Sequence, residues 1–459
     1  MSDDLIPGDE LSAADAADAV YRELLERLGE AQPQPRLGAT KRALELLGNP
    51  ESSFAIIQIA GTNGKTSTAR MIESILRAHG LRTGLFTSPH LVRFTERIGI
   101  DGERISDEAV ARNWDDIKPY LAMVDAELTA AGEPALTFFE ALTVLGFACF
   151  GDAPVDVAVV EVGMGGAWDS TNAADAEVAV FTPIDLDHVQ RLGKTIAEIA
   201  RTKAGIIKPG AQVVSAAQHP DARRAIVDAA AAVDDPAVFE GEEFALVQDA
   251  VAVGGQLITV RGRAGTYPEL YLPLYGDHQG RNATLAIAAV EAFLGGATQP
   301  IAEDVLAEGL TEVASPGRLQ LIGTEPTVLV DAAHNPHGAA SLVAALGSYF
   351  DVDEIAFVVG ILQDKDAAGI LTTLAPAASG FFFTQSESER AIPAEELSRL
   401  AASLDLPAST FADTLDEAAE DARRWAEEAP RRLVVITGSI TLVGEAIEVA
   451  DDREWKATA

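Results

Sequence analysis

Cysteine is nearly absent from this chain, and long apolar runs are missing altogether. A single cysteine, Cys149, occurs among 459 residues, so no internal disulfide can form. No run of about 18 apolar residues is present, which argues against a membrane-spanning helix. The amino terminus, Met-Ser-Asp-Asp, has neither the basic start nor the apolar stretch of a signal peptide. We therefore expect a cytoplasmic protein that does not bind membranes.

Basic residues are also scarce, because 34 Lys and Arg stand against 71 Asp and Glu, a formal net charge of −37. Such a chain could mimic nucleic acid, could be disordered, or could be folded and adapted to concentrated salt. Hydrophobic residues make up 48% of the chain, which conflicts with disorder. No basic face is evident, so nucleic-acid binding is not expected. At molar salt the screening length is about 3 Å, which removes most self-repulsion, so we favour a halophilic cytoplasm.

The length of the chain predicts two or three domains. Helical spacing marks residues 14–28 and 41–47, and residues 237–275 have the pattern of strands and turns. Short apolar strands alternate with helical stretches over the first part of the chain, at residues 54–59, 85–86, 155–162, 178–182 and 212–215. This alternation predicts an α/β domain with a mostly parallel sheet and helices on both faces.

The pattern restarts after Gly295, Gly296 and Pro300, which mark a linker. Further strands are predicted at residues 327–330, 355–359, 381–384 and 433–437, with a helix at 337–346. We expect a smaller, Rossmann-like α/β domain here, and we divide the chain into residues 1–296 and 297–459.

A glycine-rich segment lies between the strand at 54–59 and a helix predicted at 66–79, and it reads Gly61-Thr62-Asn63-Gly64-Lys65-Thr66. Backbone N–H groups and a helix N-terminus in this arrangement bind phosphate oxygens. Lys65 would reach the outer phosphates of ATP, and Thr66 would supply a hydroxyl near Mg²⁺. Ile59 stands where the common pattern has an early glycine. The alternative is an ordinary strand-to-helix turn, but the flanking strand and helix favour phosphate binding.

The loop resembles that of the Mur ligases, which use ATP to join an amino acid to a carboxylate. Other segments resemble the folylpolyglutamate synthase and dihydrofolate synthase family within that superfamily, and the matches run in order over residues 37–445. They are Thr87-Ser88-Pro89-His90-Leu91, Thr137-Phe138-Phe139-Glu140, Glu161-Val162-Gly163-Met164-Gly165-Gly166, Asp169-Ser170-Thr171-Asn172, Leu186-Asp187-His188, Lys203-Ala204-Gly205, His278-Gln279 with Asn282, Pro316-Gly317-Arg318, Asp331-Ala332-Ala333-His334-Asn335-Pro336, Asp364-Lys365-Asp366 and Thr437-Gly438-Ser439.

The resemblance implies that ATP phosphorylates the carboxylate of dihydropteroate or a reduced folate, and that L-glutamate then displaces the phosphate. It implies two Mg²⁺ ions, with Ser88, Glu161 and His188 as ligands. Each of these residues follows or ends a predicted strand, where ligands bind in open α/β sheets. The matching lysine, Lys203, is often carbamylated in the family.

The resemblance also assigns the remaining site residues. The implied ATP contacts are Gly61, Thr62, Asn63, Gly64, Lys65, Thr66, Asn282, Arg318 and Asp331, and the implied catalytic residues are Lys65, Lys203, Arg318 and His334. His334 and Ser439 would hold the incoming glutamate. The pterin site would be lined by Thr137, Phe138, Phe139, Glu140, Trp168, Asp169 and Ser170, although at least one of the two phenylalanines is expected in the core. Ala167 stands where the family often has an arginine, and Trp168 could replace charge by stacking.

Three other readings compete. A cell-wall Mur ligase acting on another carboxylate would carry an extra N-terminal domain, but only 60 residues precede Gly61. A P-loop switch or motor gives no role to Asp331 and His334. A non-catalytic nucleotide-binding scaffold is the third. Within the preferred family, first-glutamate addition and chain extension are not separated by the sequence, so we expect a bifunctional enzyme, and we expect it to be a monomer.

Overall fold

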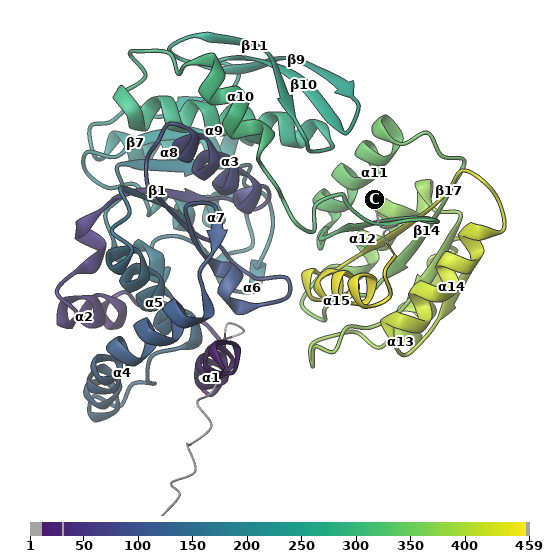
Figure 1. Ribbon diagram of the computed structural model, residues 1–459, viewed down its shortest axis with the longest axis horizontal. Coiled ribbons are helices and arrows are strands. Elements are labelled where there is room, and N and C mark those ends of the chain that lie inside the picture. The colour runs from purple at the N-terminus through teal and green to yellow at the C-terminus, as the bar shows by residue number, and fades with distance from the viewer. Residues whose placement is uncertain (1–11, 30–31, 456–459) are drawn as a thin grey trace, which may run out of the picture.

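The computed structural model describes residues 12–29 and 32–455, which form two α/β bodies and a small third sheet (Figure 1). The first body holds an eight-stranded sheet in the order β4-β3-β2-β5-β1-β6-β7-β8. Its strands are β1 (Ala55–Ala60), β2 (Thr83–Phe86), β3 (Ile98–Ile100), β4 (Glu103–Arg104), β5 (Val157–Glu161), β6 (Val178–Phe181), β7 (Gln212–Ser215) and β8 (Val238–Phe239). In this order the six strands β2, β5, β1, β6, β7 and β8 pair in parallel. The strands β3 and β4 form an antiparallel edge beside β2.

Helices cover both faces of this sheet. They are α1 (Ala13–Leu25), α2 (Gly38–Leu46), α3 (Lys65–Ala78), α4 (Asp107–Ala130), α5 (Phe138–Asp152), α6 (Val189–Leu192), α7 (Ile196–Ala204), α8 (Pro220–Ala231), α9 (Asp277–Gly295) and α10 (Glu303–Thr311), with short 3-10 turns at Pro50–Ser53, Phe94–Arg97 and Ser170–Ala173. Alternate residues of the strands face opposite layers. In β5, for example, Val157 and Val159 pack toward α3 and α9, whereas Ala158 and Val160 pack toward α5.

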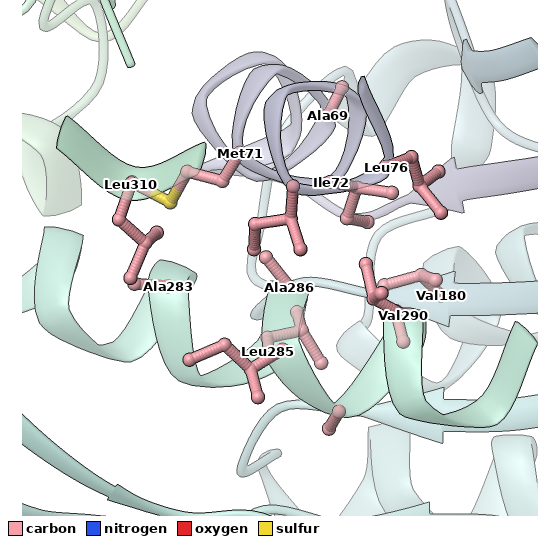
Figure 2. Packing of buried hydrophobic residues seen from close by; sticks show 14 of the residues in the cluster. Ala69, Met71, Ile72, Leu76, Val180, Ala283, Leu285, Ala286, Val290 and Leu310 are labelled. Carbon is pink, nitrogen blue, oxygen red and sulfur yellow. The ribbon is translucent and has the colours of Figure 1, made fainter. Parts of the chain in front are cut away.

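The core on one face is formed where α3 crosses α9. Figure 2 shows Ile72 and Leu76 of α3 packed over Ala286 and Val290 of α9, and Ala69 of α3 belongs to the same cluster. These side chains are fully buried, so they hold the helix that follows the phosphate loop firmly against the sheet.

Helix α10 belongs to this same core, although it lies beyond the predicted division at residue 296. Leu310 packs with Met71 (Figure 2), and the Ser74 hydroxyl donates to the carbonyl of Gly309 at 2.6 Å. A methyl group on Gly309 would lie 2.7 Å from Cα of Ile75, so the two helices are in close contact. The packing therefore favours a boundary near residue 314.

The segment predicted as strands and turns forms an antiparallel sheet in the order β11-β10-β9. Its strands are β9 (Ala245–Ala252), β10 (Gly255–Arg261) and β11 (Thr266–Leu272). The inward residues Ile258, Val260 and Leu270 are buried against α9 and α10. The sheet thus extends the core of the first body.

The second body is a six-stranded sheet in the order β12-β13-β17-β14-β15-β16, and only β12 is antiparallel. Leu329, Phe357 and Val435 face one layer of helices, and Val330, Val358 and Val434 face the other. The elements are β12 (Gln320–Thr324), β13 (Thr327–Asp331), α11 (Pro336–Tyr349), β14 (Glu354–Val359), α12 (Ala367–Leu374), a 3-10 turn at Ala375–Ala377, β15 (Gly380–Phe383), α13 (Ala394–Ser403), β16 (Ser409–Phe411), α14 (Leu415–Glu427), β17 (Arg432–Thr437) and α15 (Ile440–Asp452).

The predicted fold class is confirmed, since both bodies are α/β with mostly parallel sheets. The antiparallel edge strands β3, β4 and β12 were not predicted. The strands β3 and β4 have only three and two residues, which leaves little periodic signal, and β12 contains Gly323. Among the helices of residues 12–29 and 32–455, none is both long enough and apolar enough to cross a membrane.

The net charge of −37 generates a prediction about salt. Raising KCl from about 0.1 M to about 1 M shortens the screening length from about 10 Å to about 3 Å. This screening should weaken the repulsion among surface carboxylates. It should also weaken exposed ion pairs such as Arg431 with Asp351 and Asp353, but these pairs contribute little to stability, so the loss is smaller than the gain. We expect the Tm to rise by more than about 5 °C in calorimetry. NaCl and KCl should act alike, and a Tm that stays constant or falls would contradict salt adaptation.

Candidate active site

The phosphate loop leaves β1 through two glycines with left-handed backbone angles. Gly61 has a φ of +153°, and a methyl group there would lie 1.8 Å from the hydroxyl of Thr182. Gly64 has a φ of +85° and caps α3, and a methyl group there would lie 2.7 Å from the side-chain oxygen of Asn282. Glycine is required at both positions because neither the space nor the conformation admits a side chain. The loop therefore lies directly against β6 and α9.

A buried carboxylate, Glu161, lies beside this loop at the end of β5. The Thr66 hydroxyl donates to both of its oxygens, at 3.1 and 2.9 Å, and the backbone N–H of Ser88 donates at 3.3 Å. Lys65 Nζ lies 4.0 Å from Glu161 Oε1. Burial raises the pKa of Glu161, while Lys65 and Thr66 act in the opposite direction. The donors and the lysine around Glu161 therefore offset the cost of burying its charge only in part.

Lys203 lies beneath the loop and donates from Nζ to the carbonyl of Gly61 at 2.6 Å. Its side chain is buried, and burial together with Lys65 lowers its pKa to about 7. The predicted residues Gly61 and Lys203 therefore support the loop from below and do not line the cavity described next.

The carboxyl ends of the parallel strands in both sheets face one cavity of about 590 Å³. The first body contributes residues after β1, β2, β5 and β6, and the second contributes residues after β13, β14 and β17. The predicted residues that line it are Thr62, Asn63, Gly64, Lys65, Thr66, Ser88, Thr137, Phe139, Glu140, Glu161, Trp168, Asp169, Ser170, His188, Asn282, Arg318, Asp331, His334 and Ser439.

Hydrogen bonds across the cavity join the phosphate loop to the second body. Asn335 donates from its side-chain nitrogen to the side-chain oxygen of Asn63 at 3.1 Å. The amide nitrogen of Asn63 lies 3.0 Å from Nδ1 of His337. Asn335 also caps α11 by accepting from the N–H of Gly338 at 2.8 Å, so its amide is held in place.

An ion pair between the bodies forms near His188. Lys365 Nζ lies 3.2 Å from Asp187 Oδ1, and Asp187 Oδ2 lies 3.7 Å from Nε2 of His188. Burial alone would raise the pKa of Asp187, but His188 and Lys365 together hold it well below its ordinary value. Burial lowers the pKa of His188 to about 4, so the ring is neutral and able to accept a cation at neutral pH.

The second body adds a guanidinium, a carboxylate and a histidine. Asp331 ends β13, and its oxygens accept from the N–H groups of Leu319 at 3.0 Å and Ala333 at 2.9 Å. Burial raises its pKa, and the neighbouring Arg318 opposes that shift. His334 Nδ1 lies 2.9 Å from the carbonyl of Ala332, and burial lowers its pKa to about 4. Within the described ranges Arg318 has no ion pair, so the N–H groups of its guanidinium are available to an anionic ligand.

The proposed pterin half of the cavity has an apolar wall. Phe139 and Trp168 line it, and the ring of Phe139 lies against Phe86. The prediction for Phe138 is corrected, because the residue is only 3% exposed, packs in the core and does not line the cavity. Adjacent residues of a helix point in different directions, so one of the two had to face away.

Thr137 and Glu140 also have a structural role that the sequence did not separate from binding. They form a capping box at the start of α5, in which Thr137 accepts from the N–H of Glu140 at 3.2 Å and Glu140 accepts from that of Thr137 at 2.8 Å. Arg36 binds both oxygens of Glu140, at 2.9 and 3.1 Å. Asp169 is similarly held, since it accepts from Met164 N at 2.8 Å.

Magnesium fits this donor set. No group of three His, Cys, Asp or Glu side chains converges in the part of the chain that the structure describes. Mg²⁺ keeps several waters and is bound through one or two carboxylates plus substrate phosphates, so it does not need such a group. The buried charge of Glu161, beside the phosphate loop and facing the same cavity as Ser88 and His188, suits a divalent cation.

Several cavity residues were missed by sequence reasoning. Asp187 and Lys365 belong to segments that carry the resemblance, but nothing in the sequence places them together. Glu240 and Arg390 have no recognisable motif. Gly29, Pro33 and Gln34 precede α2 and line the cavity. Glycine, proline and glutamine do not by themselves indicate a binding site, so nothing in the sequence was a reason to choose them.

Two family profiles match most of the chain. Residues 59–290 match the Mur ligase middle domain, and residues 317–440 match the Mur ligase glutamate ligase domain. The Mycobacterium tuberculosis dihydrofolate synthase/folylpolyglutamate synthase is 42% identical over 443 residues, covering 92% of this chain and 91% of that protein. The Bacillus subtilis protein of the same name is 32% identical over 426 residues, covering 90% and 94%.

Solved structures agree with these relatives. The Mycobacterium tuberculosis folylpolyglutamate synthase complexed with ADP and AMPPCP has a TM-score of 0.90 at 41% identity, covering 95% of this chain and 99% of that one. The Escherichia coli protein in complex with DHPP and ADP has a TM-score of 0.82 at 30% identity, covering 97% and 100%.

Fold, phosphate loop and matched domains together define a Mur-type ligase. The chain belongs to the dihydrofolate synthase/folylpolyglutamate synthase family of these enzymes, and it is an ATP-dependent glutamate ligase of folate metabolism.

Proposed function

We propose that this enzyme joins L-glutamate to the carboxylate of dihydropteroate and also to that of a reduced folate, through an acyl phosphate. The observation that carries the proposal is the single cavity into which both sheets direct the carboxyl ends of their strands. It combines a phosphate loop, an apolar wall at Phe139 and Trp168, and a cationic and polar wall at Lys365 and Ser439. These three regions suit ATP, a pterin and a dicarboxylic amino acid. The known complexes of relatives with ADP and with DHPP support the first two.

The first step is phosphoryl transfer. A carboxylate oxygen of the folate substrate attacks the γ-phosphorus of ATP, and ADP leaves, so that an acyl phosphate forms. In this proposal Lys65 and the loop N–H groups bind the outer phosphates from the first body. Arg318 approaches the same phosphates from the second body, and Asn282 and Asp331 hold the nucleotide. Catalysis of this step is mainly positioning and charge neutralisation.

The second step forms the amide. The neutral amine of L-glutamate attacks the acyl carbon, phosphate leaves, and the nitrogen loses a proton. His334 is neutral at pH 7 because burial lowers its pKa to about 4, so its ring can accept a hydrogen bond from the amine. Lys365, Arg390 and Ser439 offer donors for the two glutamate carboxylates. Lys365 would exchange its present partner Asp187 for one of them.

Metal binding is assigned to Ser88, Glu161 and His188. When bound there, Mg²⁺ would neutralise charge on the transferring phosphate. The Thr66 hydroxyl, which now donates to Glu161, orients that carboxylate toward the cavity. A second Mg²⁺ would require another anionic ligand, and a carbamylated Lys203 would supply one.

The main test measures ADP release by the purified protein at high salt. Turnover should require dihydropteroate or tetrahydrofolate together with L-glutamate. Lys65→Ala should lower kcat by at least about 100-fold, because the outer phosphates lose their charged partner. Lys118→Ala is the matched control, since Lys118 is exposed and pairs with Glu23 on the surface, and it should leave kcat unchanged. Turnover without either carboxylate substrate would contradict the ligase reaction, and retained activity in Lys65→Ala would contradict the role of the loop.

Carbamylation of Lys203 has its own test. Its pKa of about 7 lies below the ordinary value for lysine, so the amine is protonated below that pH and free to react with CO₂ above it. In ¹³C-bicarbonate at pH 8, the protein should show a carbamate NMR signal that is lost near pH 6. Lys203→Arg keeps the cation but should give no signal. A spectrum at pH 8 that is the same in both proteins would contradict the modification.

A further inference from the structure

The loop that follows β2 spans the two bodies. It carries Ser88 near its start, and three residues later Leu91 reaches the second body, where its side chain packs against the hydrophobic cluster that includes Val443. Helix α15, which contributes to that cluster, lies on the side of the second body that faces the first (Figure 1). Leu91 is therefore an apolar contact between the bodies, close to the proposed metal ligands.

Two glycines of the second body make room for Leu91. A methyl group on Gly444, inside α15, would lie 2.0 Å from the carbonyl oxygen of Leu91 and 2.8 Å from its carbonyl carbon. A methyl group on Gly317 would lie 3.0 Å from Cδ2 of Leu91 and 3.1 Å from Cγ1 of Val443. Gly444 meets backbone atoms, which cannot rotate away. The two glycines thus form a socket that fits Leu91 closely.

The loop is rigid on the side of the first body. The Glu96 carboxylate accepts from the N–H groups of Leu91 at 2.9 Å, Val92 at 3.0 Å and Arg93 at 2.7 Å. Toward the cavity, the N–H of Ser88 donates to Glu161 at 3.3 Å. A displacement of Leu91 would therefore be transmitted along the loop to Ser88 and Glu161.

The socket is equally close to the nucleotide residues of the second body. Gly317 directly precedes Arg318, and the carbonyl of Gly317 accepts from the N–H of Ala332 at 2.9 Å, next to Asp331. One contact thus relates the residues that would hold the metal to those that would hold the transferring phosphate, although they belong to different bodies.

We propose that Leu91, seated in the socket of Gly317 and Gly444, is a positioning residue that sets the separation of Ser88 and Glu161 from Arg318. The expected effect of Leu91 on turnover rests on the proposed function. Its expected effect on the arrangement of the two bodies does not. Misplacing reacting groups by about 1 Å can cost about 100-fold in rate, so the fit of this contact should matter to kcat.

The test compares two helix glycines of the second body. Gly444→Ala must push Leu91 away, whereas Gly347→Ala in α11 meets no atom within 4 Å. Helix propensity favours alanine at both positions, so neither change should unfold its helix. Gly444→Ala should lower kcat by about 100-fold and leave the KM for the folate substrate, which the first body binds, unchanged. Gly347→Ala should match the wild type.

Leu91 itself provides the second pair of variants. Leu91→Ala should lower kcat as Gly444→Ala does, and Leu91→Met, which conserves the volume, should keep the wild-type value. Wild-type kcat in Leu91→Ala or in Gly444→Ala would overturn the proposal. A loss of kcat that Leu91→Met shares in full would also overturn it, since a refilled socket should restore the position.

A distance measurement separates this proposal from the proposed function. Spin labels on Met123→Cys in α4 and Arg424→Cys in α14 use two exposed positions, and the native Cys149 is buried. The distance between the labels should shift in Gly444→Ala and not in Gly347→Ala. Unchanged distances in both would overturn the positioning role. If the distance shifts in Gly444→Ala but the wild-type protein has no glutamate-dependent turnover, the proposed function is overturned and the positioning role stands.

Discussion

The arrangement of the site depends on one buried charge, the carboxylate of Glu161 at the end of β5. The Thr66 hydroxyl and the Ser88 N–H bind it, and Lys65 lies within 4.0 Å. A buried carboxylate is costly unless cations and donors surround it, and here the donors are only partly sufficient, so its pKa is raised. The same charge therefore fixes the phosphate loop and the loop after β2, and leaves the cavity attractive to a cation.

The second constraint is that neither body holds the whole site. The loop with Lys65 belongs to the first sheet, and Arg318, His334 and Lys365 belong to the second. Contacts between the two bodies differ in kind. Asn63 forms hydrogen bonds to Asn335, Asp187 forms an ion pair with Lys365, and Leu91 packs apolar surface into a glycine socket. The polar contacts can exchange partners when substrates bind, whereas the apolar contact sets the fit of the two surfaces.

The sequence predicted the elements that carry strong local signals. The strand, glycine loop and helix around Lys65 were predicted within one or two residues, and so was the position of Glu161 at a strand end. Properties that depend on packing were not accessible. Phe138 and Phe139 are chemically identical neighbours, and only the packing of α5 decides which one lines the cavity. Helix α10 follows a glycine-rich linker, yet it belongs to the first core because Gly309 lets it approach α3. Asp187 and Lys365 follow strands of two different sheets, and the hydrophobic periodicity of a sequence does not predict which side chains of two sheets will pair.

The most direct test of this account is Glu161→Gln, which keeps the shape of the side chain and removes its charge. Glutamine can still accept from Thr66 and Ser88, and the cost of a buried charge disappears, so the Tm should be equal to or higher than that of the wild type. Ligase turnover should fall by at least about 100-fold, because a cation at this site would lose its anionic ligand and the transferring phosphate would then lose the neutralising cation. Calorimetry and an ADP-release assay on the same preparation measure both. A variant that keeps wild-type turnover, or loses turnover only because it unfolds, would contradict the central role of this carboxylate.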